Sequence, residues 1–340
     1  MQRLPLERLA ALFALAAFGI LILVNLNARG TGPSDSARIS FQIATGPSDT
    51  TLFTISQAIA GLISHPPGVG RCETSTVCGP SGVILSARTT QGAFESLTAV
   101  NNGLVDSALV PADMADAAVR GQNPFRRTGP LRNVRAVAAL FAEQVHLVVR
   151  ADAGITAVGD LAGKKVVTGV PGADTANTAR TVLSAFGAGR ARRVTSDDPV
   201  ADLAAGKIDA FFVIAGAPSP LVVAALRSGK ARLLPLDGEA AQRLAQESPQ
   251  LMVATIPAGA YAGQPAIPTL ATRAVWIANA RASDTLIYAL VRALFNPANR
   301  AGLAASHLAA GEIDLNIAAQ SLPAPLQSGA ARYYREVGRL

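Results

Sequence analysis

The sequence predicts an α/β protein of two lobes, each a mostly parallel sheet flanked by helices. The chain has 340 residues, which fits two domains at roughly 150 residues per domain. Half of the residues are hydrophobic and 16% are charged. This composition supplies a large core and excludes a disordered or coiled-coil chain. Short β-type runs alternate with helical periods, as in parallel sheets covered by helices on both faces.

Residues 1–28 are predicted to be a signal peptide or an N-terminal membrane anchor. Arg3 and Arg8 precede the uninterrupted apolar run 9–24, LAALFALAAFGILILV, and this order is typical of secretory signals. The run is also close to the roughly 17–25 residues of a membrane-spanning helix, so cleavage and retention both stay open. A buried core helix is disfavoured because the run is apolar on every face. Residues 29–38, RGTGPSDSAR, read as a linker.

The two cysteines agree with export. Cys72 and Cys78 lie close together in GRCETSTVCGPSG, flanked by glycine and proline. In an oxidising compartment a local disulfide is the simpler prediction, and two free buried thiols are the alternative. Of the three histidines, His65 is the nearest and is still some way off, so we expect no metal site and no cofactor.

Strand–helix alternation occurs in two successive runs. In the first run, strands are expected at 39–44, 83–86, 106–110 and 134–141, with helices at 52–63, around 94–100 and from 112. A further strand is expected at 145–150, before the pattern restarts, and in the second run strands are expected at 165–168, 193–195, 210–214, 233–236 and 251–256. Helices are expected there at 175–186, near 202, and at 221–226. The chain ends in helices at 286–295 and about 298–308.

These runs define the predicted domains. Lobe 1 is expected to comprise residues 39–143 and 279–340, lobe 2 residues 151–268, and two hinge strands residues 144–150 and 269–278. Ligands of open α/β sheets bind outside the carboxyl ends of the strands. Two such ends that face each other across a double hinge form a cleft that can close.

Polar helix starts follow three of the predicted strands. They are Thr45-Gly46-Pro47-Ser48-Asp49-Thr50-Thr51, Thr89-Thr90-Gln91-Gly92 and Gly169-Val170-Pro171-Gly172-Ala173-Asp174-Thr175. The unpaired N–H groups and dipole of a helix start suit a carboxylate or phosphate. Ordinary N-capping explains one such start, but three are more than capping requires. The spacings of a Walker A loop and of G-x-G-x-x-G are absent.

No catalytic constellation is visible, since the sequence lacks G-x-S-x-G and H-E-x-x-H. His146 lies in an apolar strand and is either a core histidine or a ligand contact, and Asp113 either caps a helix or meets a ligand. Trp276 is expected in the core, and 332–335 (Arg-Tyr-Tyr-Arg) on a solvated helix face. The net charge of +7, with no run of five basic residues, gives no reason to expect nucleic-acid binding.

Three segments resemble the TAXI family, the extracytoplasmic solute-binding subunits of TRAP transporters. They are ATGPSDTTLFTISQAIAGLI from residue 44, ALVPADMADAAVRG from residue 108, and LVVRADAGITAVGDLAGKKVVTGVPGADT from residue 147. The resemblance covers about residues 38–310. It implies a type II periplasmic-binding-protein fold with a Venus-flytrap cleft. It also implies capture of a small organic anion, such as glutamate or another carboxylate, for a permease in the inner membrane.

The polar helix starts and this resemblance together predict a ligand site in the cleft. Backbone N–H groups after Gly46 and Gly172 would hold a carboxylate, hydroxyls would assist, and Phe53 and Pro171 would form apolar walls. The predicted ligand residues are Thr45, Gly46, Ser48, Asp49, Thr50, Thr51, Phe53, Thr90, Asp113, His146, Pro171, Gly172, Ala173, Thr175 and Ala217. Arg88, Arg150 or Arg180 could also reach the ligand.

We therefore expect a monomeric, exported solute-binding protein that is either free in the periplasm or tethered to the inner membrane through residues 9–24. Two alternatives stay open. One is a membrane-tethered sensing module of the same fold, and the other is an enzyme on this fold, which would need a reactive side chain at the cleft.

Overall fold

The computed structural model describes residues 38–66, 79–169 and 174–340. The predicted signal or anchor segment, the Cys72–Cys78 pair and the site residues Pro171, Gly172 and Ala173 therefore lie outside the described residues. Within the described ranges, no helix combines the length and apolarity needed to cross a bilayer.

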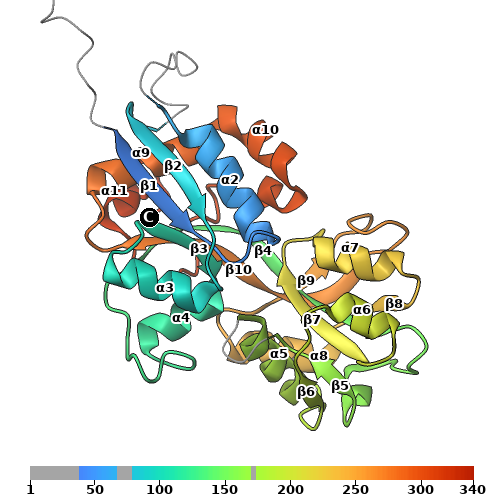
Figure 1. Ribbon diagram of the computed structural model, residues 1–340. Helices are drawn as coiled ribbons and strands as arrows, with labels where there is room; N and C mark the ends of the chain where they lie inside the picture. Colours follow the sequence, from blue (N-terminus) through green and yellow to red (C-terminus); the bar gives the residue numbers. More distant parts are fainter. Residues whose placement is uncertain (1–37, 67–78, 170–173) are drawn as a thin grey trace, which may run out of the picture. The chain divides into compact units, whose positions relative to one another are not determined.

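Strands and helices alternate along most of the chain (Figure 1). The strands are β1 (Ile39–Ala44), β2 (Val83–Arg88), β3 (Ser107–Pro111), β4 (Val134–Arg150), β5 (Lys165–Val167), β6 (Arg192–Val194), β7 (Ala210–Ala215), β8 (Ala231–Leu234), β9 (Met252–Ile256) and β10 (Ile267–Asn279). The α-helices are α2 (Thr51–Ile63), α3 (Ala93–Asn102), α4 (Ala112–Arg120), α5 (Asp174–Ala185), α6 (Pro199–Ala204), α7 (Pro220–Arg227), α8 (Gly238–Glu247), α9 (Asp284–Leu294), α10 (Pro297–Ser306) and α11 (Ser328–Glu336).

The strands are hydrogen-bonded in the order β2-β1-β3-β10-β4-β7-β5-β6, with β8 added to β4 and β9 to β10. The strands β2, β1 and β3 pair in parallel, as do β6, β5 and β7. This confirms the predicted α/β class. The long strands β4 and β10 are antiparallel to each other and connect the two parallel groups.

The prediction of two separate strands at 134–141 and 145–150 is wrong, because β4 is continuous from Val134 to Arg150. The polar pair Glu143-Gln144 interrupts the apolar pattern in the sequence. The backbone continues nonetheless because Glu143 pairs with Thr272 of β10, and Gln144 with Ala271 of β10 and Ala215 of β7.

Buried apolar side chains form four clusters, two on each side of residues 142–144 of β4 and 271–273 of β10. The first two clusters use β4 up to Phe141 and β10 from Ala274. The other two use β4 from Val145 and β10 up to Leu270. We call the part around the first two clusters lobe 1 and the part around the other two lobe 2. The exact domain and hinge boundaries given above remain predictions.

Period-two alternation along β10 explains how one strand serves two cores of lobe 1. Trp276 and its neighbours two residues away, Ala274 and Ala278, face the cluster made with α2, α9 and α11. Val275 and Ile277 face the cluster made with α3 and α4. In lobe 2, α5 and α8 cover one face and α6 and α7 the other.

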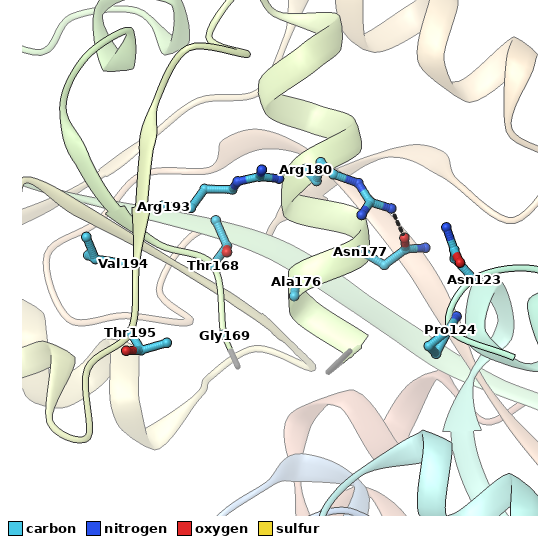
Figure 2. A pocket seen from close by; sticks show the side chains of 10 residues that line it. All are labelled: Asn123, Pro124, Thr168, Gly169, Ala176, Asn177, Arg180, Arg193, Val194 and Thr195. Carbon is cyan, nitrogen blue, oxygen red and sulfur yellow. Dashed lines mark hydrogen bonds between the residues drawn. The ribbon is translucent and has the colours of Figure 1, made fainter. Parts of the chain in front are cut away.

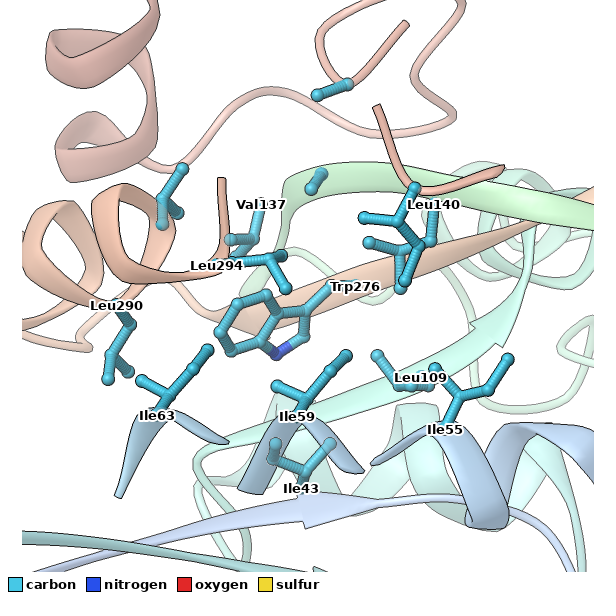
Figure 3. Close-up of a cluster of buried hydrophobic side chains, with 14 of the residues drawn as sticks. Ile43, Ile55, Ile59, Ile63, Leu109, Val137, Leu140, Trp276, Leu290 and Leu294 are labelled. Carbon is cyan, nitrogen blue, oxygen red and sulfur yellow. The ribbon is translucent and has the colours of Figure 1, made fainter. Parts of the chain in front are cut away.

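Trp276 lies at the centre of the larger lobe 1 core, as predicted. Its side chain is fully buried and lies among Ile59, Ile63, Leu290 and Leu294 (Figure 3). Burial of so large an apolar surface is a major source of stability for this lobe.

The prediction that 332–335 lie on a solvated helix face is wrong for its two tyrosines. Tyr333 and Tyr334 are buried where α11 packs on α9, and the Tyr334 hydroxyl donates to the Val137 carbonyl at 2.8 Å. Arg332 stays outside, over the ring of Tyr288. The flanking arginines disguise an amphipathic helix whose apolar side is aromatic.

Candidate functional site

Buried polar side chains gather where the two lobes meet. On β4 they are Glu143, Gln144 and His146, and on β10 they are Thr269 and Thr272. We call these five residues the polar seam. Glu143, Gln144 and Thr272 lie between the lobe 1 and lobe 2 core stretches of the two strands, whereas His146 and Thr269 lie at the edge of the lobe 2 stretch, next to Val145 and Leu270. Buried polar groups are costly unless they are hydrogen-bonded, so each contact of the seam is informative.

The start of α2 contacts the turn after β7 across the seam. Thr50 caps α2 by accepting from the Phe53 N–H, and the next residue, Thr51, donates to the Gly216 carbonyl at 3.1 Å. The Ala217 N–H then donates to Gln144 Oε1 at 3.0 Å. The structure thus brings two predicted site residues, Thr51 and Ala217, from opposite lobes to the same place.

Asp113 makes a second contact between the lobes. It lies in the first turn of α4, and its carboxylate accepts from Thr178 Oγ1 of α5 at 2.7 Å and from Thr272 Oγ1 of the seam at 3.5 Å. Burial raises the pKa of Asp113, and these hydrogen bonds oppose that rise. Thr175 lies one turn before Thr178, partly buried at the start of α5.

The ends of β1 and β2 are held together by hydroxyls. Thr90 Oγ1 lies 2.8 Å from Ser96 Oγ, and Ser96 donates to the Thr45 carbonyl at 3.1 Å. Thr45 Oγ1 in turn donates to the Gly46 carbonyl. The structure therefore brings together Thr45, Gly46 and Thr90, whereas Ser48 and Asp49 project at the surface and Phe53 is partly buried.

His146 belongs to a buried chain of hydrogen bonds. The Ser219 N–H donates to the Tyr261 hydroxyl at 2.9 Å, and that hydroxyl lies 2.8 Å from His146 Nε2. The tyrosine hydroxyl and Nε2 share one hydrogen bond, and its donor depends on which ring nitrogen carries the proton. Nδ1 has no hydrogen-bond partner among the residues that the structure covers.

Burial controls the ionisation of this chain. It lowers the pKa of His146 to about 4 and raises that of Tyr261 to about 12. Both groups are therefore neutral near pH 7. His146 is buried in the seam rather than exposed to solvent, and its predicted contact with ligand remains a prediction.

A cavity of about 860 Å³ opens at the carboxyl ends of β5 and β6. Asn123 and Pro124, from the loop after α4 in lobe 1, lie on one side of it (Figure 2). From lobe 2 it is lined by Thr168, Gly169, Asn177, Arg180, Arg193 and Thr195, among others. Such a position at strand ends is where open α/β sheets bind ligands.

Sequence reasoning identified part of this cavity. Gly169 stands in the predicted turn after β5, and Arg180 was one of three arginines expected to reach the ligand. Arg193, Asn123 and Tyr261 were missed. Arg193 opens the predicted strand 193–195 and lies inside β6, so no polar residue at a strand end marked it. Nothing in the local sequence indicates Asn123 or Tyr261.

In the part of the chain that the structure describes, no group of three or more His, Cys, Asp or Glu side chains is placed to hold a metal ion. The candidate site consists of hydroxyls, backbone N–H groups and guanidinium groups at the cavity and at the neighbouring strand ends. These groups can bind and orient a solute.

Comparison with known proteins identifies one family and several solved structures to which this chain is similar. A profile of the NMT1-like family matches residues 43–338. Among solved structures, a TctC solute binding protein from Polaromonas is 16% identical, with 90% of this chain and 100% of that one covered and a TM-score of 0.47. The periplasmic aliphatic sulphonate binding protein SsuA from Escherichia coli is 14% identical over 88% and 84% of the two chains, with a TM-score of 0.45.

A third structure, XAC2383 from Xanthomonas citri bound to ATP, is 12% identical over 88% of this chain and 95% of that one, with a TM-score of 0.47. Because all three TM-scores lie below 0.5, we infer nothing about the ligand from these neighbours.

Proposed function

The chain belongs to the NMT1-like family of periplasmic solute-binding proteins, and from this premise we propose that it captures a small organic anion for a TRAP-type permease of the inner membrane. Solute-binding proteins bind small molecules and deliver them to membrane transporters. The ligand class and the type of transporter are the proposed part.

One observation supports capture by closure more than any other. Thr51 at the start of α2 donates to the Gly216 carbonyl of lobe 2, so the carboxyl-end turn of β1 meets the carboxyl-end turn of β7. The two lobes have separate apolar cores and are joined through β4 and β10. A solute held between such lobes favours the closed arrangement to the extent that it contacts both.

The proposed anion has suitable donors on both lobes. The first turn of α2 follows Thr50, and the first turn of α5 contains Thr175. Helix starts attract anions through their free N–H groups and dipole. The resemblance of residues 38–310 to TAXI proteins supports a carboxylate and a TRAP permease.

A thermal-shift screen of residues 29–340 against carboxylates, amino acids and sugars tests the proposal. A solute at 100 times its dissociation constant adds about 2.7 kcal/mol to stability, which is a readily measured shift. We expect stabilisation by carboxylates or amino acids. Stabilisation by neutral sugars alone would contradict the anion, and no response to any solute class would contradict solute capture.

Two substitutions test the site itself. We expect Thr51→Ala and Thr175→Ala each to weaken carboxylate binding several-fold, because a lost hydrogen bond costs about 1 kcal/mol. Thr54→Ala is the matched control, since Thr54 is an exposed threonine of the same helix as Thr51. Unchanged affinity in both variants, measured by calorimetry, would refute this site assignment.

Transport tests the partner. Uptake of the identified solute into cells that express a TRAP permease should require this protein and should collapse when the ion gradient is dissipated. Uptake that depends on ATP hydrolysis and persists without the gradient would replace the TRAP permease with an ABC transporter.

A further inference from the structure

The cavity at the ends of β5 and β6 has a strongly one-sided charge. Two of its lining residues are arginines, Arg180 of α5 and Arg193 of β6, and none of the lining residues whose side chains the structure describes is Asp or Glu. Figure 2 shows the Arg193 side chain extending from β6 toward α5, the helix that carries Arg180. Two positively charged side chains therefore line the same cavity.

The local structure aims these two side chains. Successive residues of a strand point to opposite faces, so Arg193 lines the cavity while its neighbour Arg192 does not. Arg180 donates from Nη2 to Asn177 Oδ1 at 2.5 Å, one turn earlier on the same helix. This hydrogen bond fixes the direction of one guanidinium and leaves its other N–H groups available.

Neither guanidinium is neutralised within the described ranges. Other arginines form ion pairs there, namely Arg120 with Asp116, Arg150 with Asp152 and Asp209, and Arg300 with Asp314. Among the carboxylate side chains that the structure describes, none lies within ion-pair distance of Arg180 or Arg193. A guanidinium recognises carboxylate, phosphate or sulfonate through paired N–H donors, so this pair is suited to an oxyanion.

The rest of the lining suits a carbon skeleton with polar groups. Thr168, Thr195 and Asn123 offer hydroxyl and amide groups, and Pro124 and Val194 offer apolar surface. The volume of about 860 Å³ lies near the upper end of the roughly 300–1,000 Å³ range of small-molecule sites. A single amino acid would leave much of this space unfilled.

We propose that Arg180 and Arg193 together bind the acidic end of an extended organic oxyanion whose carbon skeleton lies in this cavity. This deepens the proposed function and rests on it. The anionic end is held from lobe 2, by side chains of α5 and β6, while Asn123 and Pro124 of lobe 1 bound the other side. Ligand size and charge are thereby read at the same site.

Calorimetric titration with defined probes tests the proposal. The probes are glutarate as a short dicarboxylate, suberate as an extended dicarboxylate, glycerol 3-phosphate as a phosphate ester, and glucose as a neutral solute. The variants are Arg180→Gln, Arg193→Gln and the double variant, with Arg192→Gln as the control. Arg192 is exposed on the same strand and is not among the residues that line the cavity. Its replacement removes the same net charge as each cavity variant, but from outside the cavity.

We expect at least one anionic probe to bind the wild type, tenfold or more weaker binding in each single cavity variant, and wild-type affinity in Arg192→Gln. Raising the salt concentration should weaken binding to the wild type more than to the double variant. The carboxylate and phosphate probes then distinguish which oxyanion is preferred.

The outcomes separate the two levels of inference. Anion binding that is equal in wild type and double variant refutes the arginine site and leaves solute capture intact. Binding of glucose but of no anion refutes the arginine site in the same way. Binding that falls equally in all three single variants shows a diffuse charge effect and also refutes it. No binding of any probe, or of any solute in the thermal-shift screen, refutes the proposed function as well.

Discussion

The lobe cores and the polar seam bury their side chains equally well, but with opposite chemistry. The cores around Trp276 and Phe211 consist of apolar residues whose contacts do not depend on direction. In the seam, Gln144, His146 and Thr272 each need a partner at a defined distance and angle. The apolar cores therefore stabilise each lobe by itself, whereas the contacts of Asp113 in α4 with Thr272 and with Thr178 of α5 depend on how the lobes are placed. This division is what a protein that closes on a solute requires.

The largest expected effect is a loss of stability caused by damage to one of the apolar cores. Trp276→Ala leaves a void among Ile59, Ile63 and Leu290, so we expect a loss of about 3–5 kcal/mol in the free energy of unfolding. Chemical denaturation checks this loss. Trp276→Phe fills most of the space and should cost clearly less. Equal losses in both variants would contradict a packing role for the indole.

The next effect separates the two regions by pH. His146 has a pKa of about 4 in the folded protein against 6.5 in the unfolded chain. Between these values the unfolded chain binds a proton that the folded protein does not, so stability falls as pH falls from about 6.5 to about 4. The expected loss is roughly 3 kcal/mol in total, and it levels off about one pH unit outside this window.

Calorimetry at several pH values measures that slope. His146→Gln should flatten it, since glutamine does not titrate, even if the variant is less stable at pH 7. Thr269→Val, at a neutral residue of the seam, is the control and should keep the wild-type slope, because it removes no titrating group. A slope unchanged in His146→Gln would show that other groups cause the acid sensitivity.

The success of the sequence in predicting the fold follows the same division. Apolar periodicity predicted the alternation of elements, and it placed Trp276 in the core. It failed at 142–144, where polar residues suggested a break that β-sheet pairing overrides. It failed again at Tyr333 and Tyr334, because arginines on either side hid the buried face of α11. Periodicity reports burial against apolar neighbours, and it is silent where a polar residue is buried for its hydrogen bonds.

The site was predictable only as far as local signals reach. Polar helix starts identified Thr51 and the turn that follows β5. The partners of these groups lie far away in the sequence, as in Thr51 with Gly216, separated by 165 residues, and Tyr261 with His146, separated by 115. No local pattern encodes such pairs. The side chains that complete the seam and the cavity could therefore be assigned only from the structure.

A smaller effect is expected from crowding the contact between the start of α2 and the turn after β7. A Cβ at Gly216 would lie 2.7 Å from the Ala309 Cβ and 2.9 Å from Thr51 Cγ2. Gly216→Ala must therefore push α2 and the turn after β7 apart, and we expect a loss of about 1–3 kcal/mol together with weaker solute binding. Gly61→Ala is the control in the same helix α2, where the added methyl meets nothing within 4 Å.

The control should change stability in the opposite direction, because replacing a glycine inside a helix by alanine stabilises by about 0.5–1 kcal/mol. Differential scanning calorimetry and solute titration of both variants make the comparison. Gly216→Ala with wild-type stability and affinity would mean that the lobes are not held at this distance.

The smallest effect concerns the contact between Asp113 and Thr178. A double-mutant cycle of Asp113→Asn and Thr178→Val should give a coupling of about 1 kcal/mol in stability, because a hydrogen bond between partly buried groups is lost. The control is Asp116→Asn on the same helix. Its surface ion pair with Arg120 is expected to contribute at most about 0.5 kcal/mol.

Solute affinity decides what this last contact does. The bond joins α4 of lobe 1 to α5 of lobe 2, so its loss should lower the population of the closed arrangement and weaken solute binding by a similar factor. Coupling in stability with unchanged affinity would make Asp113 a structural tie that persists in every arrangement of the lobes. Coupling in both would mean that the contact between Asp113 and Thr178, unlike the apolar cores, contributes to the free energy of closing on the solute.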